Sequence, residues 1–257
     1  LMCARVIAIV GRMSIRSARR SANTLPIVAP QGSIETILSA SNQLGCGPMS
    51  AAGDVFDFFG GISDLEAKIV RFVGDPATRI AEDFLRILRF FRFQARYAAL
   101  DIPHDPGVLR AIREGVPGLG MLSPERVWSE IFRILAAPDP GRAVALMAEL
   151  GVLEKVLPGA DPGGLKRLIA IGAPADPLSR LAAMGGFGEL RLSTAERVRL
   201  LALCQPSSLT PTADDDDIRR ALADGLPDIL TGQAWLSEAG PGALLPMLER
   251  GAGSGAE

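Results

Sequence analysis

Residues 71–90 read RFVGDPATRIAEDFLRILRF, and this stretch decides the fold. The Gly-Asp-Pro turn at 74–76 ends the preceding segment, and Thr78 can cap a helix that we predict over residues 78–99. At 100° per residue, apolar side chains recur on two faces of this helix, which predicts packing against neighbours on both sides. A basic stripe lies between the two faces and consists of Arg89, Arg92 and Arg96.

Helices are predicted on the C-terminal side of this stretch but not on its N-terminal side. Ser123 and Pro124 are typical of the start of a helix, which we expect to reach residue 135. From residue 151 to 250, helical segments alternate with Pro/Gly turns. Residues 51–74, in contrast, look β-rich, because 67–73 (AKIVRFV) alternates apolar and basic side chains as a half-buried strand does.

Composition excludes several classes of protein. Hydrophobic residues make up 48% of the 257 residues and the formal net charge is −2, so any nucleic-acid contact must be a local patch. Three cysteines and one histidine argue against a disulfide scaffold and most histidine-based metal sites, and they fit a reducing, cytoplasmic location. No apolar run approaches the roughly 18 residues of a membrane helix, so we expect no membrane partner.

Three segments together resemble the class II nucleotidyltransferases, the family of tRNA CCA-adding enzymes and bacterial poly(A) polymerases. Residues 57–65 (DFFGGISDL) are similar to the family's D-x-x-G-G-x-x-D-L turn. Residues 71–90 are similar to R-F-V-G-x-P…R-I-x-E-D-x-L-R-x-L-R-F, and residues 123–130 to S-x-E-R-x-x-x-E. The resemblance covers residues 54–250, closely up to 135 and loosely beyond.

The resemblance implies a mainly α fold, a helical neck and body that follow a small remnant of an α/β nucleotidyltransferase head. Residues 1–50 are an atypical segment, which we interpret as a frame-shifted or truncated head. Residues 51–75 are then the remnant of the head, 76–150 the neck that selects the nucleotide, and 151–257 the body and tail that bind tRNA.

Asp83 and Arg86 have a chemical interpretation of their own. They stand at i, i+3 on the predicted helix, where one side chain accepts hydrogen bonds and the other donates them. Cytosine and adenine each place an amino donor beside a ring-nitrogen acceptor, whereas uracil and guanine reverse that order. The pair can therefore accept C and A without a template, and the resemblance implies this role. The alternative is a surface ion pair.

Further side chains complete the candidate site. Guanidinium groups suit phosphates, and the resemblance places two residues of the 123–130 segment near the nucleotide. The candidates for nucleotide contact are therefore Arg89, Arg92, Glu125 and Arg126, and those for RNA phosphate contact are Arg79 and Arg96. For each of these, a solvated or structural role remains the alternative, and helix initiation explains Glu125 and Arg126 equally well.

The metal-binding carboxylates of the family have no counterpart in this sequence. Nucleotidyl transfer needs divalent ions on adjacent carboxylates, which is D-x-D in the resembling family. Residues 1–56 contain only Glu35 and Asp54 as acids, and Asp54 and Asp57 would face opposite sides of a strand. We therefore assign no catalytic residue and no metal ligand, although the resemblance implies Mg²⁺ as cofactor.

The resemblance implies transfer of CMP and AMP from CTP and ATP to the 3′ end of tRNA. Poly(A) addition is an alternative within the same family. A non-catalytic helical fragment that binds RNA or nucleotide is an alternative of another class, so whether this chain is itself an enzyme stays open.

Overall fold

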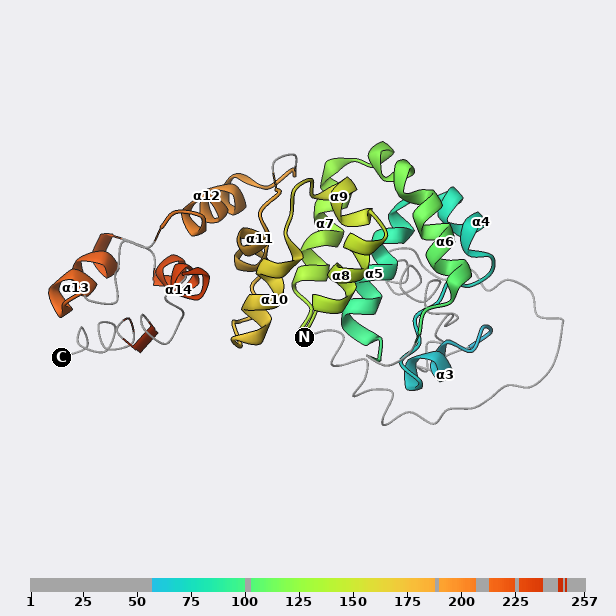
Figure 1. Cartoon of the computed structure of the whole chain (residues 1–257), viewed down its shortest axis with the longest axis horizontal. Helices are drawn as coiled ribbons and strands as arrows, with labels where there is room; N and C mark the ends of the chain where they lie inside the picture. Colours follow the sequence, from blue (N-terminus) through green and yellow to red (C-terminus); the bar gives the residue numbers. More distant parts are fainter. Residues whose placement is uncertain are drawn as a thin grey trace, which may run out of the picture.

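The fold is an elongated array of helices that runs from α3 and α4 at one end to α13 and α14 at the other (Figure 1). This computed structural model describes residues 57–99, 103–187, 190–206, 213–224, 227–237, 245, 246 and 248. Within these residues the regular elements are helices and no strand is present, which confirms the mainly α fold class. The predictions for residues 1–50 lie outside the described part.

The expected β-rich segment is wrong where the structure describes it. Residues Gly61–Glu66 form helix α3, because the carboxylate of Asp57 accepts hydrogen bonds from the backbone N–H groups of Gly61 and Ile62 at 2.8 and 2.9 Å. Gly60, with φ 78°, makes the preceding turn in a conformation that glycine adopts freely. Residues 69–72 are extended but pair with no strand in the described ranges.

The single helix predicted over residues 78–99 is in fact two helices, α4 (Pro76–Glu82) and α5 (Leu85–Tyr97). Asp75, not Thr78, is the N-cap of α4, and its carboxylate accepts from the Thr78 N–H at 2.8 Å. Asp83 has extended backbone angles and ends α4. The break therefore falls at the residue that carries the proposed base selectivity.

The next helices pack around α5. They are α6 (Pro106–Gly115), the 3₁₀ helix η1 (Val116–Met121), α7 (Pro124–Leu135), α8 (Gly141–Glu149) and α9 (Val152–Val156). Helix α5 packs on α7 and α8, while α4 packs on α6. The predicted helix start is confirmed, because the Ser123 hydroxyl accepts from the Arg126 N–H at 3.4 Å.

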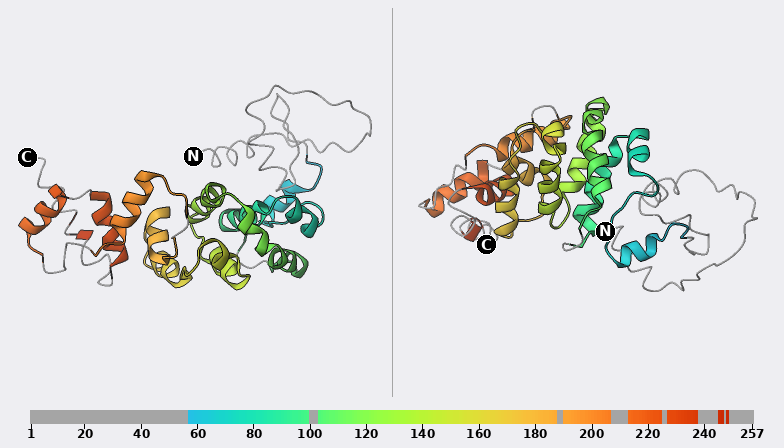
Figure 2. Two further views of the ribbon diagram at one scale, coloured as in Figure 1. Left: turned by 90° about the horizontal axis from the view of Figure 1, so that it is seen from above. Right: turned by 45° about the vertical axis from the view of Figure 1, so that its right-hand side comes forward.

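The remaining helices continue the array toward the C-terminal end (Figure 2). They are α10 (Pro162–Ala170), α11 (Pro177–Met184), α12 (Thr194–Leu203), α13 (Asp215–Asp224) and α14 (Pro227–Leu236). Helices α10 and α11 touch backbone to backbone at Gly164, where an added Cβ would stand 1.8 Å from the Ala183 carbonyl oxygen. Only glycine permits this approach.

One hydrophobic core runs from α4 through α12, with Phe91, Ile112 and Leu181 among its fully buried members. A second, smaller core holds Ile218, Leu230, Ala234 and Leu248. No helix in the described residues is long and apolar enough to cross a membrane. The large core joins helices from both sides of residue 150, so the start of α5 rests on a continuous packed scaffold.

Candidate nucleotide-binding site

Asp83 lies in the break between α4 and α5, where its carboxylate accepts a hydrogen bond from the N–H of Leu85, the first residue of α5, at 3.1 Å. The same carboxylate receives Arg126 Nη2 at 3.0 and 3.3 Å, so it bridges the starts of α5 and α7. The Asp83 side chain is 26% exposed and that of Arg126 is 48% exposed. Two residues 43 positions apart, both expected at the site, are therefore in direct contact.

The Arg86 N–H donates to the Asp83 carbonyl oxygen at 3.0 Å, but the Arg86 side chain projects from the first turn of α5 toward α4 and not toward the Asp83 carboxylate. Its Nη1 donates to the Arg79 carbonyl oxygen at 2.8 Å and to the Glu82 carboxylate. Arg79 Nη1 donates to the same carboxylate at 2.7 Å. Hydrogen bonding from Arg86, helped by the charges of both arginines, lowers the pKa of Glu82 against a small opposing effect of burial. Glu82 thus holds Arg79 and Arg86 side by side.

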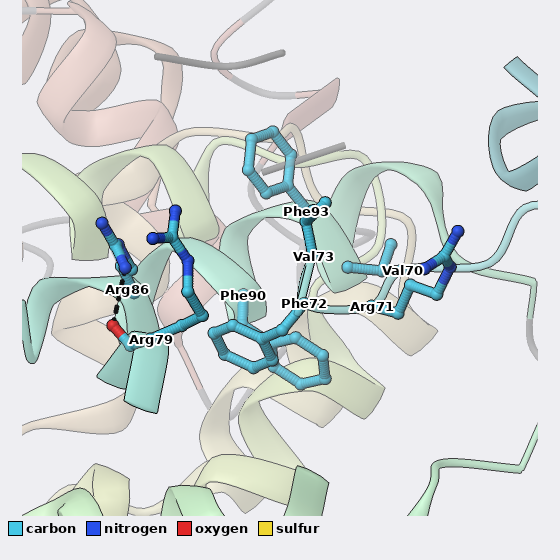
Figure 3. A pocket seen from close by; sticks show the side chains of 8 residues that line it. All are labelled: Val70, Arg71, Phe72, Val73, Arg79, Arg86, Phe90 and Phe93. Carbon is cyan, nitrogen blue, oxygen red and sulfur yellow. Dashed lines mark hydrogen bonds between the residues drawn. The ribbon is translucent and has the colours of Figure 1, made fainter. Parts of the chain in front are cut away.

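Arg79 and Arg86 also line a small cavity between α5 and the extended segment before α4 (Figure 3). The lining residues are Val70, Arg71, Phe72, Val73, Arg79, Arg86, Phe90 and Phe93. Phe72 and Phe90 stack with ring centroids 5.5 Å apart. The cavity volume is about 20 Å³, which is room for a water molecule and not for a base.

Arg71 ties the segment before α4 to the α3 turn. Its Nη2 donates to the Phe59 carbonyl oxygen at 2.7 Å, and its Nε lies 2.7 Å from Asp64. Burial alone would raise the pKa of Asp57, but hydrogen bonds from four backbone N–H groups of this turn, Ile62 foremost, lower it overall. The carboxylate of Asp57 and the guanidinium of Arg71 therefore both stabilise this turn.

Arg89 and Arg92 turn toward α7 instead of toward the cavity. Both contact Glu130, whose side chain is only 3% exposed. Arg92 Nη1 lies 2.9 and 3.1 Å from the two carboxylate oxygens, and Arg89 Nε lies 3.6 Å from one of them. Arg133 Nη1 approaches the same carboxylate at 3.4 Å. We name this group the arginine cluster: Arg89, Arg92, Arg133 and Glu130.

Sequence reasoning did not assign Glu130 or Arg133 to the site. A signal was present, because Glu130 closes the 123–130 motif and stands at i, i+3 from Arg133. The contact with α5 spans 38 residues, and no local pattern shows such a distance.

Glu125 and Arg96 stand apart from these groups. Glu125 is exposed in the first turn of α7 and lies 3.9 Å from Arg191, a residue that leads into α12. Arg96 is exposed in the last turn of α5. Neither lines the cavity.

The donor set of the described residues does not fit a divalent metal ion. No group of three or more His, Cys, Asp or Glu side chains in these ranges could hold one. Glu35 and Asp54 lie outside the described residues. We therefore derive no step through Mg²⁺.

Comparison with known proteins follows the same segments. Residues 104–163 match a family described as "Probable RNA and SrmB- binding site of polymerase A". The mitochondrial CCA tRNA nucleotidyltransferase 1 of Danio rerio is 45% identical over 102 residues, 40% of this chain and 24% of that protein. The CCA-adding enzyme of Bacillus licheniformis is 39% identical over 122 residues, 48% of this chain and 30% of that protein.

Solved structures agree in fold. The Bacillus stearothermophilus CCA-adding enzyme in complex with CTP aligns with a TM-score of 0.60 and 23% identity, covering 80% of this chain and 55% of that chain. A tRNA-processing enzyme in its apo form 2 aligns with a TM-score of 0.57, covering 77% and 64%. The matched segments thus span a quarter to a third of the curated relatives above.

These matches confirm the resemblance to the class II CCA-adding nucleotidyltransferases over the part of the chain that they cover.

Proposed function

We propose that this chain acts in CCA addition to tRNA, with the start of α5 as the place where CTP and ATP are selected over UTP and GTP. One observation carries the proposal. The helix break presents Asp83 and Arg86, an acceptor and a donor, at the first turn of α5 within the motif that resembles the family. The relatives named above are CCA-adding enzymes, and one solved neighbour is a complex with CTP.

The contacts of both side chains leave hydrogen-bonding capacity for a base. A carboxylate offers about four lone-pair positions, and the Asp83 contacts with Leu85 and Arg126 use three of them. A guanidinium carries five N–H donors, and the contacts of Arg86 with Arg79 and Glu82 both use Nη1. Asp83 can therefore accept the amino group of C or A while Arg86 donates to the adjacent ring nitrogen.

The wrong bases fail on the same two atoms. Uracil and guanine would set a carbonyl oxygen against the Asp83 carboxylate and an N–H against the Arg86 guanidinium. Each mismatch leaves a desolvated polar group without a partner, which is the strong form of rejection available to a binding site. The Asp83 carboxylate is 26% exposed and its partner Arg126 is 48% exposed, so we propose that the base approaches on the side where these two side chains meet.

The division into a neck over residues 76–150 and a body and tail over 151–257 belongs to the same proposal. We expect tRNA to contact the body, and we expect its phosphates to contact Arg79 and Arg96 in the neck as well. The match of residues 104–163 to a family described as RNA-binding supports an RNA partner. We infer a cytoplasmic location from the few cysteines, although the Danio rerio relative is named mitochondrial.

The direct test is incorporation of radiolabelled nucleotides into a tRNA that lacks its CCA end. The full 257-residue chain is incubated with Mg²⁺ and each labelled triphosphate in turn. Incorporation of C and A, and not of U, supports CCA addition. Binding of CTP with discrimination against UTP, but without incorporation, supports the non-catalytic alternative. Equal binding of CTP and UTP contradicts the selection site itself.

Poly(A) addition is a second candidate, because the family description for residues 104–163 names polymerase A. Asp83 and Arg86 fit adenine as well as cytosine, so the base-reading geometry serves both reactions. Extension with A alone in the same assay would assign poly(A) addition instead.

A further inference from the structure

The arginine cluster carries more positive charge than its buried carboxylate balances. Arg89, Arg92 and Arg133 all lie within 4.0 Å of Glu130, and in the described residues no other acid approaches them that closely. The cluster therefore holds three positive charges and one negative charge. One guanidinium would suffice to keep a buried carboxylate paired, so the second and third need another explanation.

The excess positive charge is unfavourable, because the guanidinium groups are partly buried and repel one another. Burial lowers the pKa of the Arg92 guanidinium, Glu130 raises it, and the charges of Arg133 and Arg89 lower it again. The side chains of Arg92 and Arg89 are 18% and 25% exposed, so water screens their mutual repulsion only in part. A bound anion would offset this repulsion.

Free donors of the cluster point to the kind of anion. Arg89 contacts Glu130 through Nε and Arg133 through Nη1 alone, which leaves at least the two terminal nitrogens of Arg89 and one of Arg133 for a ligand. The Arg133 side chain is 56% exposed, so a ligand can reach it from solvent. Planar guanidinium forks match the oxygen spacing of phosphate groups.

We propose that Arg89, Arg92 and Arg133 form a phosphate-binding site in which buried Glu130 acts as a positioning residue. The site differs from the base-selecting pair in place. At 100° per residue, Arg89 and Arg92 stand about 60° and 120° around α5 from Arg86, and they are absent from the cavity lining. The inference rests on the proposed function, because the phosphate belongs to a bound nucleotide or to RNA.

Both sources fit the position of the cluster. Asp83 meets Arg126 at the start of α7, and Arg133 follows two turns later, about 10 Å along the axis. A triphosphate whose base lies at Asp83 could extend along this seam between α5 and α7. The backbone of an RNA strand that crosses the seam would present the same phosphate oxygens. The experiment therefore measures the two sources separately.

The test uses Arg133→Gln in the full chain, with Arg113→Gln as control. Arg113 is an exposed arginine on α6, outside the cluster, and its substitution changes the net charge equally. Binding is measured for CTP, for cytidine and for a tRNA transcript. If a nucleotide supplies the phosphate, Arg133→Gln weakens CTP binding about tenfold and leaves cytidine binding unchanged.

If RNA supplies the phosphate, Arg133→Gln leaves CTP binding unchanged and weakens tRNA binding. The slope of log affinity against log salt concentration then falls by about 1. The site is refuted if neither ligand responds, if cytidine responds as much as CTP, or if Arg113→Gln has the same effect as Arg133→Gln.

Glu130→Gln tests whether Glu130 positions the arginines or whether their positive charge alone attracts the phosphate. The substitution makes the cluster more positive, so Coulomb attraction alone predicts tighter phosphate binding. If Glu130 positions the arginines, Glu130→Gln weakens it, while Arg133→Lys, which keeps the charge without the planar fork, binds with intermediate affinity. Tighter binding by Glu130→Gln would overturn the positioning role. These outcomes are independent of discrimination between CTP and UTP, which tests the base-selecting pair alone.

Discussion

Replacement of Asp83 by alanine is the sharpest test of base selection. The variant removes the only side-chain acceptor of the proposed pair, so the amino group of cytosine loses a hydrogen bond to a charged partner. Such a bond contributes about 1.5–3 kcal/mol, which corresponds to a factor of about 10–150 in affinity. Binding of UTP improves at the same time, because its carbonyl oxygen no longer faces a carboxylate. We expect the ratio of CTP to UTP affinity to fall by at least that factor, while the Arg86 guanidinium, which still faces the ring nitrogen, keeps the remaining preference for CTP.

The effect of Asp83→Ala on stability should be small by comparison. The variant loses the hydrogen bond from the Leu85 N–H, which contributes about 1 kcal/mol. It also loses the ion pair with Arg126, whose partners are 26% and 48% exposed and which therefore contributes less than about 1 kcal/mol. The melting temperature should fall by only a few degrees, so the variant stays folded in a binding assay.

Asp105→Ala is the matched control. Asp105 caps α6 by accepting from the Gly107 N–H at 2.8 Å, so its loss has a similar cost in stability without touching the site. Competition of CTP and UTP for a fluorescent CTP analogue measures both affinities in each variant. The reasoning fails if Asp83→Ala keeps the discrimination of the unmodified chain, or if Asp105→Ala loses it to the same extent.

Three further predictions concern the scaffold and are checked by thermal and denaturant unfolding. Gly164→Ala should destabilise the fold by about 1–3 kcal/mol, because its Cβ would meet the Ala183 carbonyl oxygen at 1.8 Å; unchanged stability would contradict this packing. Arg180→Met should cost about 2–4 kcal/mol, because buried Arg180 donates to the carbonyl oxygen of Leu135, the last residue of α7, at 2.6 Å and to those of Ala137 and Pro138 just after it; a neutral effect would refute that role. Burial raises the pKa of Asp176, but hydrogen bonds from Ser179 and the charge of Arg199 lower it overall. Its stabilising effect is thus present above the unfolded pKa of about 3.9 and lost as pH falls through the lower folded value, so Asp176→Asn should flatten the loss of stability below pH 4, and an unaltered acid limb would argue against it.

The sequence predicts a helix start correctly where a capping side chain and a proline lie next to each other at that start. Ser123 and Pro124 fix the start of α7 through a side-chain cap and a residue that needs no N–H donor, and the helix runs to Leu135 as expected. Asp75 does the same for α4, but Thr78 offered a competing cap in the sequence. Thr78 instead donates its hydroxyl to Asp75 at 2.7 Å.

The break at Asp83 was not predictable, because the apolar period continues through it and neither glycine nor proline marks it. At the break, the chain packs against a distant segment. Phe84 packs against Gly118 of η1, where an added Cβ would lie 2.3 Å from the ring. Gly115 leaves similar room for Ile80. The residues on either side of the break therefore pack against residues more than 30 positions away, which no local pattern reveals.

The strand expected over residues 67–73 failed for a related reason. Alternation of apolar and polar side chains gives the right period for a strand, but a strand also needs a partner to bond its backbone. In the described ranges this segment has only isolated contacts, such as the Ala99 N–H to the Lys68 carbonyl oxygen at 3.0 Å. The pattern in the sequence marks an extended segment and cannot show whether a neighbour completes a sheet.

The same limit explains what the sequence showed of the site. It singled out Asp83, Arg86 and Arg126 by motif, but it placed Asp83 and Arg86 on one uninterrupted helix. In such a helix the Asp83 N–H would enter the backbone ladder, and the side chain would lie along the surface of the turn. In the structure Asp83 has an extended backbone, and its carboxylate accepts from the Leu85 N–H at the start of α5 and meets Arg126 of α7. Arg86 remains helical and is held by α4 through Glu82. The carboxylate and the guanidinium are therefore positioned by contacts with two different helices, and the proposed base selection depends on the helix break that separates them.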